Sequence, residues 1–100
     1  MAIRPGDPVF TFDTWGVALN APAASGVYAL CNVNGLYLYF GETHDIRRRL
    51  ADHLDDPHDG SRLKGATAFA YELWPTEDER VTKRNILVAL YPTPRDEMLG

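Results

Sequence analysis

The clearest pattern along the chain is a pair of strand-forming apolar runs with a turn signal between them. The runs cover residues 27–31 and 36–40, and Asn34-Gly35 separates them. Aromatic and β-branched residues favour strands, and Asn-Gly is strongly favoured in tight hairpin turns. We therefore predict a β-hairpin over this part of the chain.

A helical repeat follows the hairpin. Ile46, Leu50 and Leu54 recur every four residues, which places them on one face of a helix. Thr43 comes shortly before the repeat and belongs to a residue type that caps helices. The pattern predicts a helix over residues 44–54 with Thr43 as its cap.

A further strand and a second helix are predicted in the second half of the chain. Residues 66–74 alternate in polarity and are rich in aromatic side chains, which is typical of a strand. Thr76 and Glu79 then have the spacing of a capping box. The helix that they begin is expected to end near residue 90, because Pro92 cannot continue it. The predicted order of elements is β-β-α-β-α.

The first part of the chain has a different character. Residues 1–24 are rich in proline, alanine and turn-forming residues, and only residues 9–12 alternate as a short edge strand would. We expect an N-terminal arm here, followed by one domain. The length of 100 residues fits a single core of ordinary size.

Composition and charge exclude several classes of protein. Apolar residues make up 45% of the chain and charged residues 24%, as in folded domains rather than disordered segments. A net charge of -4 argues against a uniformly basic surface, so a polyanion would have to bind locally. The lone Cys31 excludes an internal disulfide and a multi-cysteine zinc site. Residues 1–20 contain no continuous apolar run, so we expect a soluble protein with no membrane partner, and a single reduced cysteine is typical of a cytoplasmic protein.

The densest set of polar side chains lies at the end of the hairpin and along the first predicted helix. Its members are Tyr28, Tyr39, Gly41, Arg49 and His53. Arg49 and His53 share a helix face because they are four residues apart, and the two tyrosines come from paired strands. Arginine offers a fork of donors to a phosphodiester, and tyrosine or histidine can take a proton from water. Ordinary packing and a solvated helix face use the same residue types, so spacing alone leaves both interpretations open.

Two short motifs add a family resemblance. Gly-Val-Tyr at residues 26–28 and Tyr-Phe-Gly at residues 39–41 are separated by ten residues. Arg49 and His53 follow eight and twelve positions after the glycine of the second motif. In this arrangement the chain resembles the GIY-YIG nuclease superfamily, as a stand-alone domain similar to the N-terminal domain of excinuclease C or the catalytic domain of homing endonucleases.

The resemblance covers residues 25–94 and implies a fold. It implies an α+β domain with a small three-stranded antiparallel sheet flanked by helices. On this basis we expect the arm over residues 1–24, the domain over residues 25–95 and a C-terminal tail over residues 96–100. The activity implied is hydrolysis of phosphodiester bonds in nucleic acid, with DNA the expected partner and RNA the alternative.

Site residues are implied by the same resemblance. Tyr28 and Tyr39 would be the active-site tyrosines, one acting as the general base or as the hydrogen-bond partner of the base. Arg49 would hold the phosphate and offset the developing negative charge. His53 would support the tyrosines or contact the phosphate. The expected substrate contacts are Gly41, Thr43 and Arg48.

The chain departs from the family at the metal ligand. The family carries a glutamate on the last helix that binds Mg²⁺ or Mn²⁺, about nine residues before a proline. Counting back from Pro92 gives Lys83. An ammonium group has no acceptor and repels a divalent cation, so this residue puts the expected cofactor in doubt.

Three explanations of Lys83 stay open at this point. The domain has lost catalysis and binds nucleic acid or a protein partner. Alternatively, Glu79, one helical turn earlier and on the same face, supplies the metal ligand from a shifted position. In the third explanation Lys83 itself places its positive charge beside the phosphate in a metal-independent mechanism.

Overall fold

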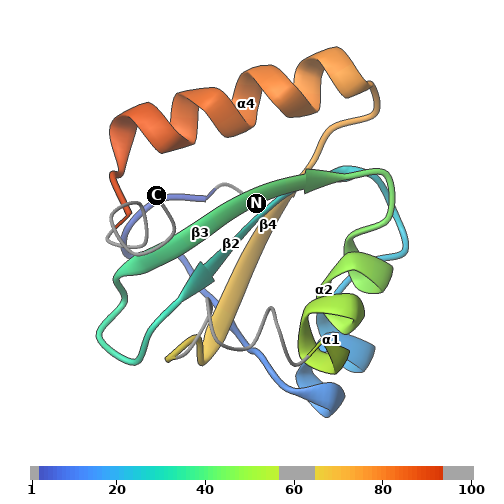
Figure 1. Cartoon of the computed structure of the whole chain (residues 1–100), viewed down its shortest axis with the longest axis vertical. Coiled ribbons are helices and arrows are strands. Elements are labelled where there is room, and N and C mark those ends of the chain that lie inside the picture. The colour runs from blue at the N-terminus through green and yellow to red at the C-terminus, as the bar shows by residue number, and fades with distance from the viewer. Residues whose placement is uncertain (1–2, 57–64, 94–100) are drawn as a thin grey trace.

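The computed structural model describes residues 3–56 and 65–93, which form a four-stranded antiparallel sheet with helices on both faces (Figure 1). In chain order the elements are β1 (Phe10–Thr11), α1 (Thr14–Asn20), β2 (Gly26–Cys31), β3 (Tyr37–Thr43), α2 (Ile46–Asp55), β4 (Ala68–Leu73) and α4 (Glu77–Leu90). The strands lie in the order β1-β4-β2-β3. The α+β class and the predicted order β-β-α-β-α are confirmed within this arrangement, but the expected three strands are corrected to four.

The additional strand comes from the segment predicted as an arm. β1 lies within residues 9–12 and pairs with β4 at the edge of the sheet, as the alternation there suggested. α1 follows directly and is capped by Asp13, whose side chain accepts a hydrogen bond from the backbone N–H of Gly16 at 2.7 Å. Residues 10–20 are therefore part of the folded layer structure. The predicted tail over residues 96–100 lies outside the described residues.

The hairpin predicted around Asn34-Gly35 is present. β2 and β3 pair antiparallel, with Tyr28 opposite Gly41. Gly35 has a φ of 82°, a left-handed conformation that glycine adopts at low cost in turns. The hairpin thereby brings the two tyrosine motifs onto neighbouring strands.

Alternation along β2 gives the sheet two distinct faces. Val27, Ala29 and Cys31 belong to the core that packs against α4. Tyr28 and Leu30 point to the opposite face and pack with Ile46 and other residues of the core beneath α1 and α2. Figure 1 shows α4 on one side of the sheet and the α1–α2 pair on the other.

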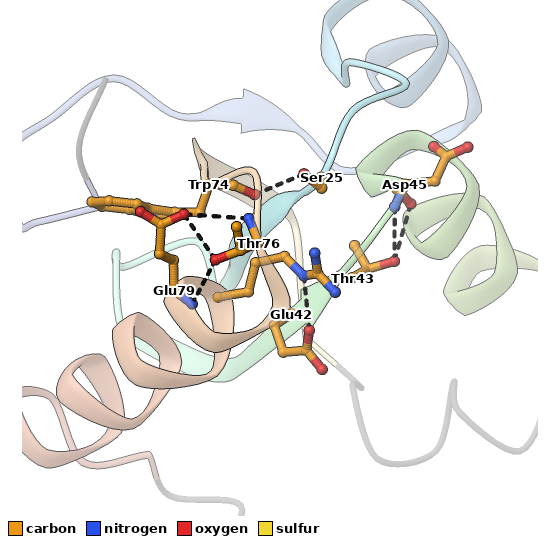
Figure 2. A network of polar contacts seen from close by, with 8 residues as sticks. Ser25, Glu42, Thr43, Asp45, Trp74, Thr76 and Glu79 are labelled. Carbon is orange, nitrogen blue, oxygen red and sulfur yellow. Dashed lines mark hydrogen bonds and ion pairs between the residues drawn. The ribbon is translucent and has the colours of Figure 1, made fainter.

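The two longer helices begin at different kinds of cap. The predicted cap of α2 is wrong: Asp45, not Thr43, holds the helix start, accepting a hydrogen bond from the backbone N–H of Arg48. Thr43 instead bonds to the backbone of Asp45 in the turn before the helix. The capping box of α4 is confirmed, with reciprocal bonds between Thr76 and Glu79 (Figure 2).

Among residues 3–56 and 65–93, no helix combines the length and the apolar character that crossing a membrane requires.

Candidate active site

Tyr28 and His53 form the centre of the site. Tyr28 comes from β2 and His53 from the last turn of α2, and the Tyr28 hydroxyl lies 2.7 Å from Nε2 of His53. Both side chains are buried, with 1% and 4% of their surface exposed. A short hydrogen bond satisfies two polar groups that would be costly to bury alone. The sequence brings them together because Ile46 and Leu50 hold α2 against the same face of the sheet.

Tyr39 completes an aromatic cluster around this hydrogen bond. Its ring centroid lies 6.1 Å from that of Tyr28 and 5.6 Å from that of His53. The imidazole is thus flanked by two tyrosines, each in an edge-on arrangement. Tyr39 is only partly buried, so it is the tyrosine of the pair that solvent and a ligand reach more readily.

Arg49 brings a positive charge to the tyrosines. Burial raises the pKa of Tyr28 well above its ordinary value, and the nearby Tyr39 raises it further, whereas the charge and hydrogen bonding of Arg49 lower it. Burial is the largest of these effects. The Tyr28 hydroxyl therefore keeps its proton at neutral pH, and its chemistry is that of a neutral hydrogen-bonding group.

Gly41 is required by the position of the Tyr28 ring. A Cβ atom at Gly41 would lie 2.3 Å from both Cζ and the hydroxyl oxygen of Tyr28. Real Cβ atoms do not approach other atoms so closely, so only glycine leaves space for the ring. Gly41 is buried against this ring, which makes it a support for Tyr28 in this structure.

A hollow of about 290 Å³ lies at the start of α2. The residues that line it are Thr43, His44, Asp45, Arg48, Arg49 and Asp52. Arg48 is exposed, and Thr43 is held by the turn before the helix. The structure therefore brings Thr43, Arg48 and Arg49 to one opening, and of these Arg49 also lowers the pKa of Tyr28.

Lys83 lies on the opposite face of the sheet from the tyrosines. Its ammonium nitrogen is 3.6 Å from a carboxylate oxygen of Glu72 in β4. Glu72 is opposite Val27 in the sheet and therefore faces α4, whereas Tyr28 and Tyr39 face α2. The structure does not bring Lys83 to the tyrosines, Arg49 and His53.

Glu72 is a buried carboxylate that the sequence analysis missed. It is 5% exposed and accepts hydrogen bonds from the backbone N–H of Ile3 at 2.6 Å and from Nε1 of Trp74 at 3.1 Å. One sequence signal was available, because Glu72 continues the period-two pattern of Ala68 and Ala70 toward the core. Nothing local in the sequence indicates that Lys83 is its partner.

The two residues of α4 considered as the metal-binding position, Lys83 and Glu79, do not fit a divalent cation. Glu79 is engaged in the capping box, where one of its carboxylate oxygens accepts bonds from the backbone N–H and the hydroxyl of Thr76. Lys83 is paired with Glu72 and has no acceptor to offer. Within residues 3–56 and 65–93 there is no group of three or more histidine, cysteine or acidic side chains able to hold a metal. We therefore derive no catalytic step through a metal ion.

Comparisons with known proteins identify the family of this chain. Residues 24–84 match the family model of the GIY-YIG catalytic domain. UvrABC system protein C of Treponema pallidum (strain Nichols) is 33% identical over 81 residues, which cover 78% of this chain. The aligned part spans only 12% of the length of that relative.

Solved structures show the same fold. A point mutant of the GIY-YIG N-terminal endonuclease domain of UvrC from Thermotoga maritima, bound to its catalytic divalent cation, matches with a TM-score of 0.65. The identity is 23%, covering 77% of this chain and 87% of that chain. The same domain bound to magnesium matches with a TM-score of 0.63 and 23% identity over 77% of this chain and 88% of that chain. With its paired motifs, its fold and this family match, the chain belongs to the GIY-YIG catalytic domain family.

Proposed function

We propose that this domain hydrolyses phosphodiester bonds in nucleic acid, with DNA as the first substrate to test. The observation that carries the proposal is the buried hydrogen bond between Tyr28 and His53, with Tyr39 and Arg49 beside it. Family membership supports the reaction class, and the matching UvrC domain is named an endonuclease domain. The hollow that Arg49 lines would receive a phosphate group.

Proton transfer in this proposal ends on His53. An attacking water gives its proton to the Tyr39 hydroxyl, which passes its own proton to Tyr28, and Tyr28 passes its proton to Nε2 of His53. The resulting hydroxide adds to phosphorus, and the leaving oxygen takes a proton from solvent. An imidazole suits the final step because it ordinarily titrates near neutral pH, whereas burial keeps the proton on Tyr28. Nε2 of His53 must start without a proton, as an acceptor from Tyr28.

Arg49 would bind and stabilise the phosphate. Its guanidinium offers paired donors to two phosphate oxygens, and its charge is placed where negative charge builds up in the transition state. Thr43 and Arg48, on the rim of the same hollow, would position the flanking backbone of the nucleic acid. Backbone contacts of this kind give affinity without sequence specificity.

The experiment is a cleavage assay on labelled single-stranded and double-stranded DNA and RNA, in Mg²⁺ and in EDTA. We expect cleavage to be weak and to persist in EDTA, because Lys83, paired with Glu72, occupies the position of the family's metal ligand. His53→Gln and Tyr39→Phe should each remove at least 90% of it. Tyr71→Phe is the control, since Tyr71 faces the same side of the sheet from β4. Robust cleavage that EDTA abolishes would contradict the metal-independent mechanism.

A second function, binding without catalysis, is favoured by one observation. Lys83 and Glu72 neutralise one another on α4 and β4, where the family resemblance would have a metal ligand. If no substrate is cut under either condition while DNA binds in an Arg49-dependent manner, the domain is a nucleic-acid binding module. Binding of a protein partner at the same surface would be measured as competition with that DNA.

A further inference from the structure

The row of residues next to Tyr28 carries two carboxylates. Glu42 of β3, Val27 of β2 and Glu72 of β4 lie opposite one another across the sheet. The next row along the strands consists of Gly41, Tyr28 and Tyr71, which are also in register. Each residue of the first row is therefore the sequence neighbour of a residue in the second row. Alternation turns the first row toward α4 and the second toward α2.

Helix α4 supplies a positively charged side chain to each carboxylate. Nε of Arg80 lies 3.0 Å from Glu42, and Nζ of Lys83 lies 3.6 Å from Glu72. Figure 2 shows the contact at Glu42, where an arginine side chain from the helix meets the carboxylate. Arg80 and Lys83 are three residues apart, so both side chains extend from neighbouring positions on the side of α4 that faces the sheet.

These ion pairs are partly buried, which distinguishes them from ion pairs on the solvent-exposed surface. The side chains of Arg80 and Glu72 are 12% and 7% exposed. A charge at such a position is poorly hydrated, so removing its partner leaves a costly unpaired charge. Glu72 also holds the backbone of Ile3 and the indole of Trp74, which ties the N-terminal segment and the approach to α4 to the same carboxylate.

We infer that Arg80 and Lys83 are positioning residues, which clamp the strands behind Tyr28 with internal positive charge so that the Tyr28–His53 pair forms without a divalent cation. The inference rests on the proposed function, because it takes Tyr28 and His53 to be the catalytic pair. Lys83 then acts on the sheet through Glu72 and does not contact the phosphate.

The first test measures metal binding by the wild-type chain, using the electron paramagnetic resonance signal of free Mn²⁺. We expect no stoichiometric loss of that signal and no change in melting temperature when Mn²⁺ or EDTA is added. Stoichiometric binding that Glu72→Gln removes would overturn the inference. This measurement does not depend on cleavage, so it stands even if the proposed nuclease activity is absent.

The second test asks whether the clamp reaches the catalytic pair. Lys83→Met should lower the melting temperature by about 5 °C and shift the ring-proton resonances of His53. Lys83→Arg should restore both, because it keeps the charge beside Glu72. Arg84→Met, the neighbouring position on α4, is the matched control and should leave His53 unchanged. A lower melting temperature with unaltered His53 resonances would show a merely structural ion pair and overturn the positioning role.

A third variant keeps the test decisive if Lys83→Met does not fold. Lys83→Gln removes the charge but keeps a side chain that can donate a hydrogen bond to Glu72, and it leaves the bonds of Glu72 to Ile3 and Trp74 in place. The variant should fold and should shift the His53 resonances. Unaltered His53 resonances in folded Lys83→Gln would overturn the positioning role.

Discussion

The two faces of the sheet stabilise their buried polar groups in different ways. On the α2 face, a hydroxyl and an imidazole meet in a short hydrogen bond among aromatic rings. On the α4 face, formal charges are paired, at Glu42 with Arg80 and at Glu72 with Lys83. The hydrogen-bonded pair on the α2 face can exchange a proton, whereas the charged pairs on the α4 face serve to hold elements together.

This difference arises between immediate sequence neighbours. Tyr28 follows Val27 and Glu42 follows Gly41, yet the members of each pair face opposite sides. A strand can therefore place a reactive group on one side and its support on the other with no additional residues. The two sides should respond differently to mutation, and the following predictions test this from the largest effect to the smallest.

Gly41→Ala should disrupt the α2 face most severely. The new methyl group would occupy the place of the Tyr28 ring, and we expect a loss of about 3 kcal/mol or more in the free energy of unfolding. Urea unfolding followed by circular dichroism measures it. Gly35→Ala is the control: no atom lies within 4 Å of its Cβ position, so only its left-handed backbone is strained, by about 1 kcal/mol. Equal losses would mean that Tyr28 does not require Gly41.

Alkaline pH should weaken both faces. Burial raises the pKa of Cys31 from 9.0 to about 11 and of Tyr37 from 10.0 to about 12, both on the α4 face, and raises that of Tyr28 on the other face. A raised pKa means that the fold favours the protonated form. This stabilisation is complete below pH 9 and is lost as pH rises through 11 to 12.

Substitution of Cys31 tests whether the loss of stability at alkaline pH arises on the α4 face. Cys31 alone accounts for a loss on the order of 2 kcal/mol. Melting temperatures measured from pH 8 to pH 12 should fall less steeply for Cys31→Ala, beginning near pH 9. Identical pH profiles for this variant and the wild type would place the alkaline transition elsewhere.

Tyr28→Phe should lower stability less than these changes do, and it should alter the surroundings of the His53 ring. Removing the hydroxyl takes away the 2.7 Å partner of buried His53, and the expected loss is about 1 to 2 kcal/mol. The His53 ring protons should shift in a nuclear magnetic resonance spectrum. Unchanged His53 resonances would mean that the Tyr28 hydroxyl is not the hydrogen-bond partner of the imidazole.

Arg48→Ala should leave both faces intact. Arg48 is exposed at the rim of the hollow, so the free energy of unfolding should change by less than about 0.5 kcal/mol. If nucleic acid passes this rim, the slope of log affinity against log salt concentration should fall by about one. An unchanged slope would place the nucleic-acid path away from Arg48.

Local patterns were sufficient for most of the elements and for the core of the site. The Asn34-Gly35 turn, the four-residue repeat of α2 and the capping box of α4 each depend on residues close in sequence. The helical spacing of Arg49 and His53 likewise places both on the side of α2 that meets the tyrosines. These features need little tertiary information.

Features that depend on distant partners were not predictable in the same way. Thr43 and Asp45 are both good caps, and the path of the turn after β3 decides between them. Counting from Pro92 gives the position of Lys83 along the chain but not the face of the sheet that it meets. Glu72 is the clearest case, because its partners Ile3, Trp74 and Lys83 come from three separate segments.

The bond between Ile3 and Glu72 also constrains the order of folding. It joins residues 69 positions apart, so two segments distant in sequence must be brought together to close it. Contacts of such sequence separation are entropically costly until intervening structure has formed. We expect the hairpin of β2 and β3 to form early and the segment at Ile3 to be secured after β4 has paired with β2. During synthesis, Ile3 must wait for a carboxylate that is made 69 residues later before it reaches this native contact.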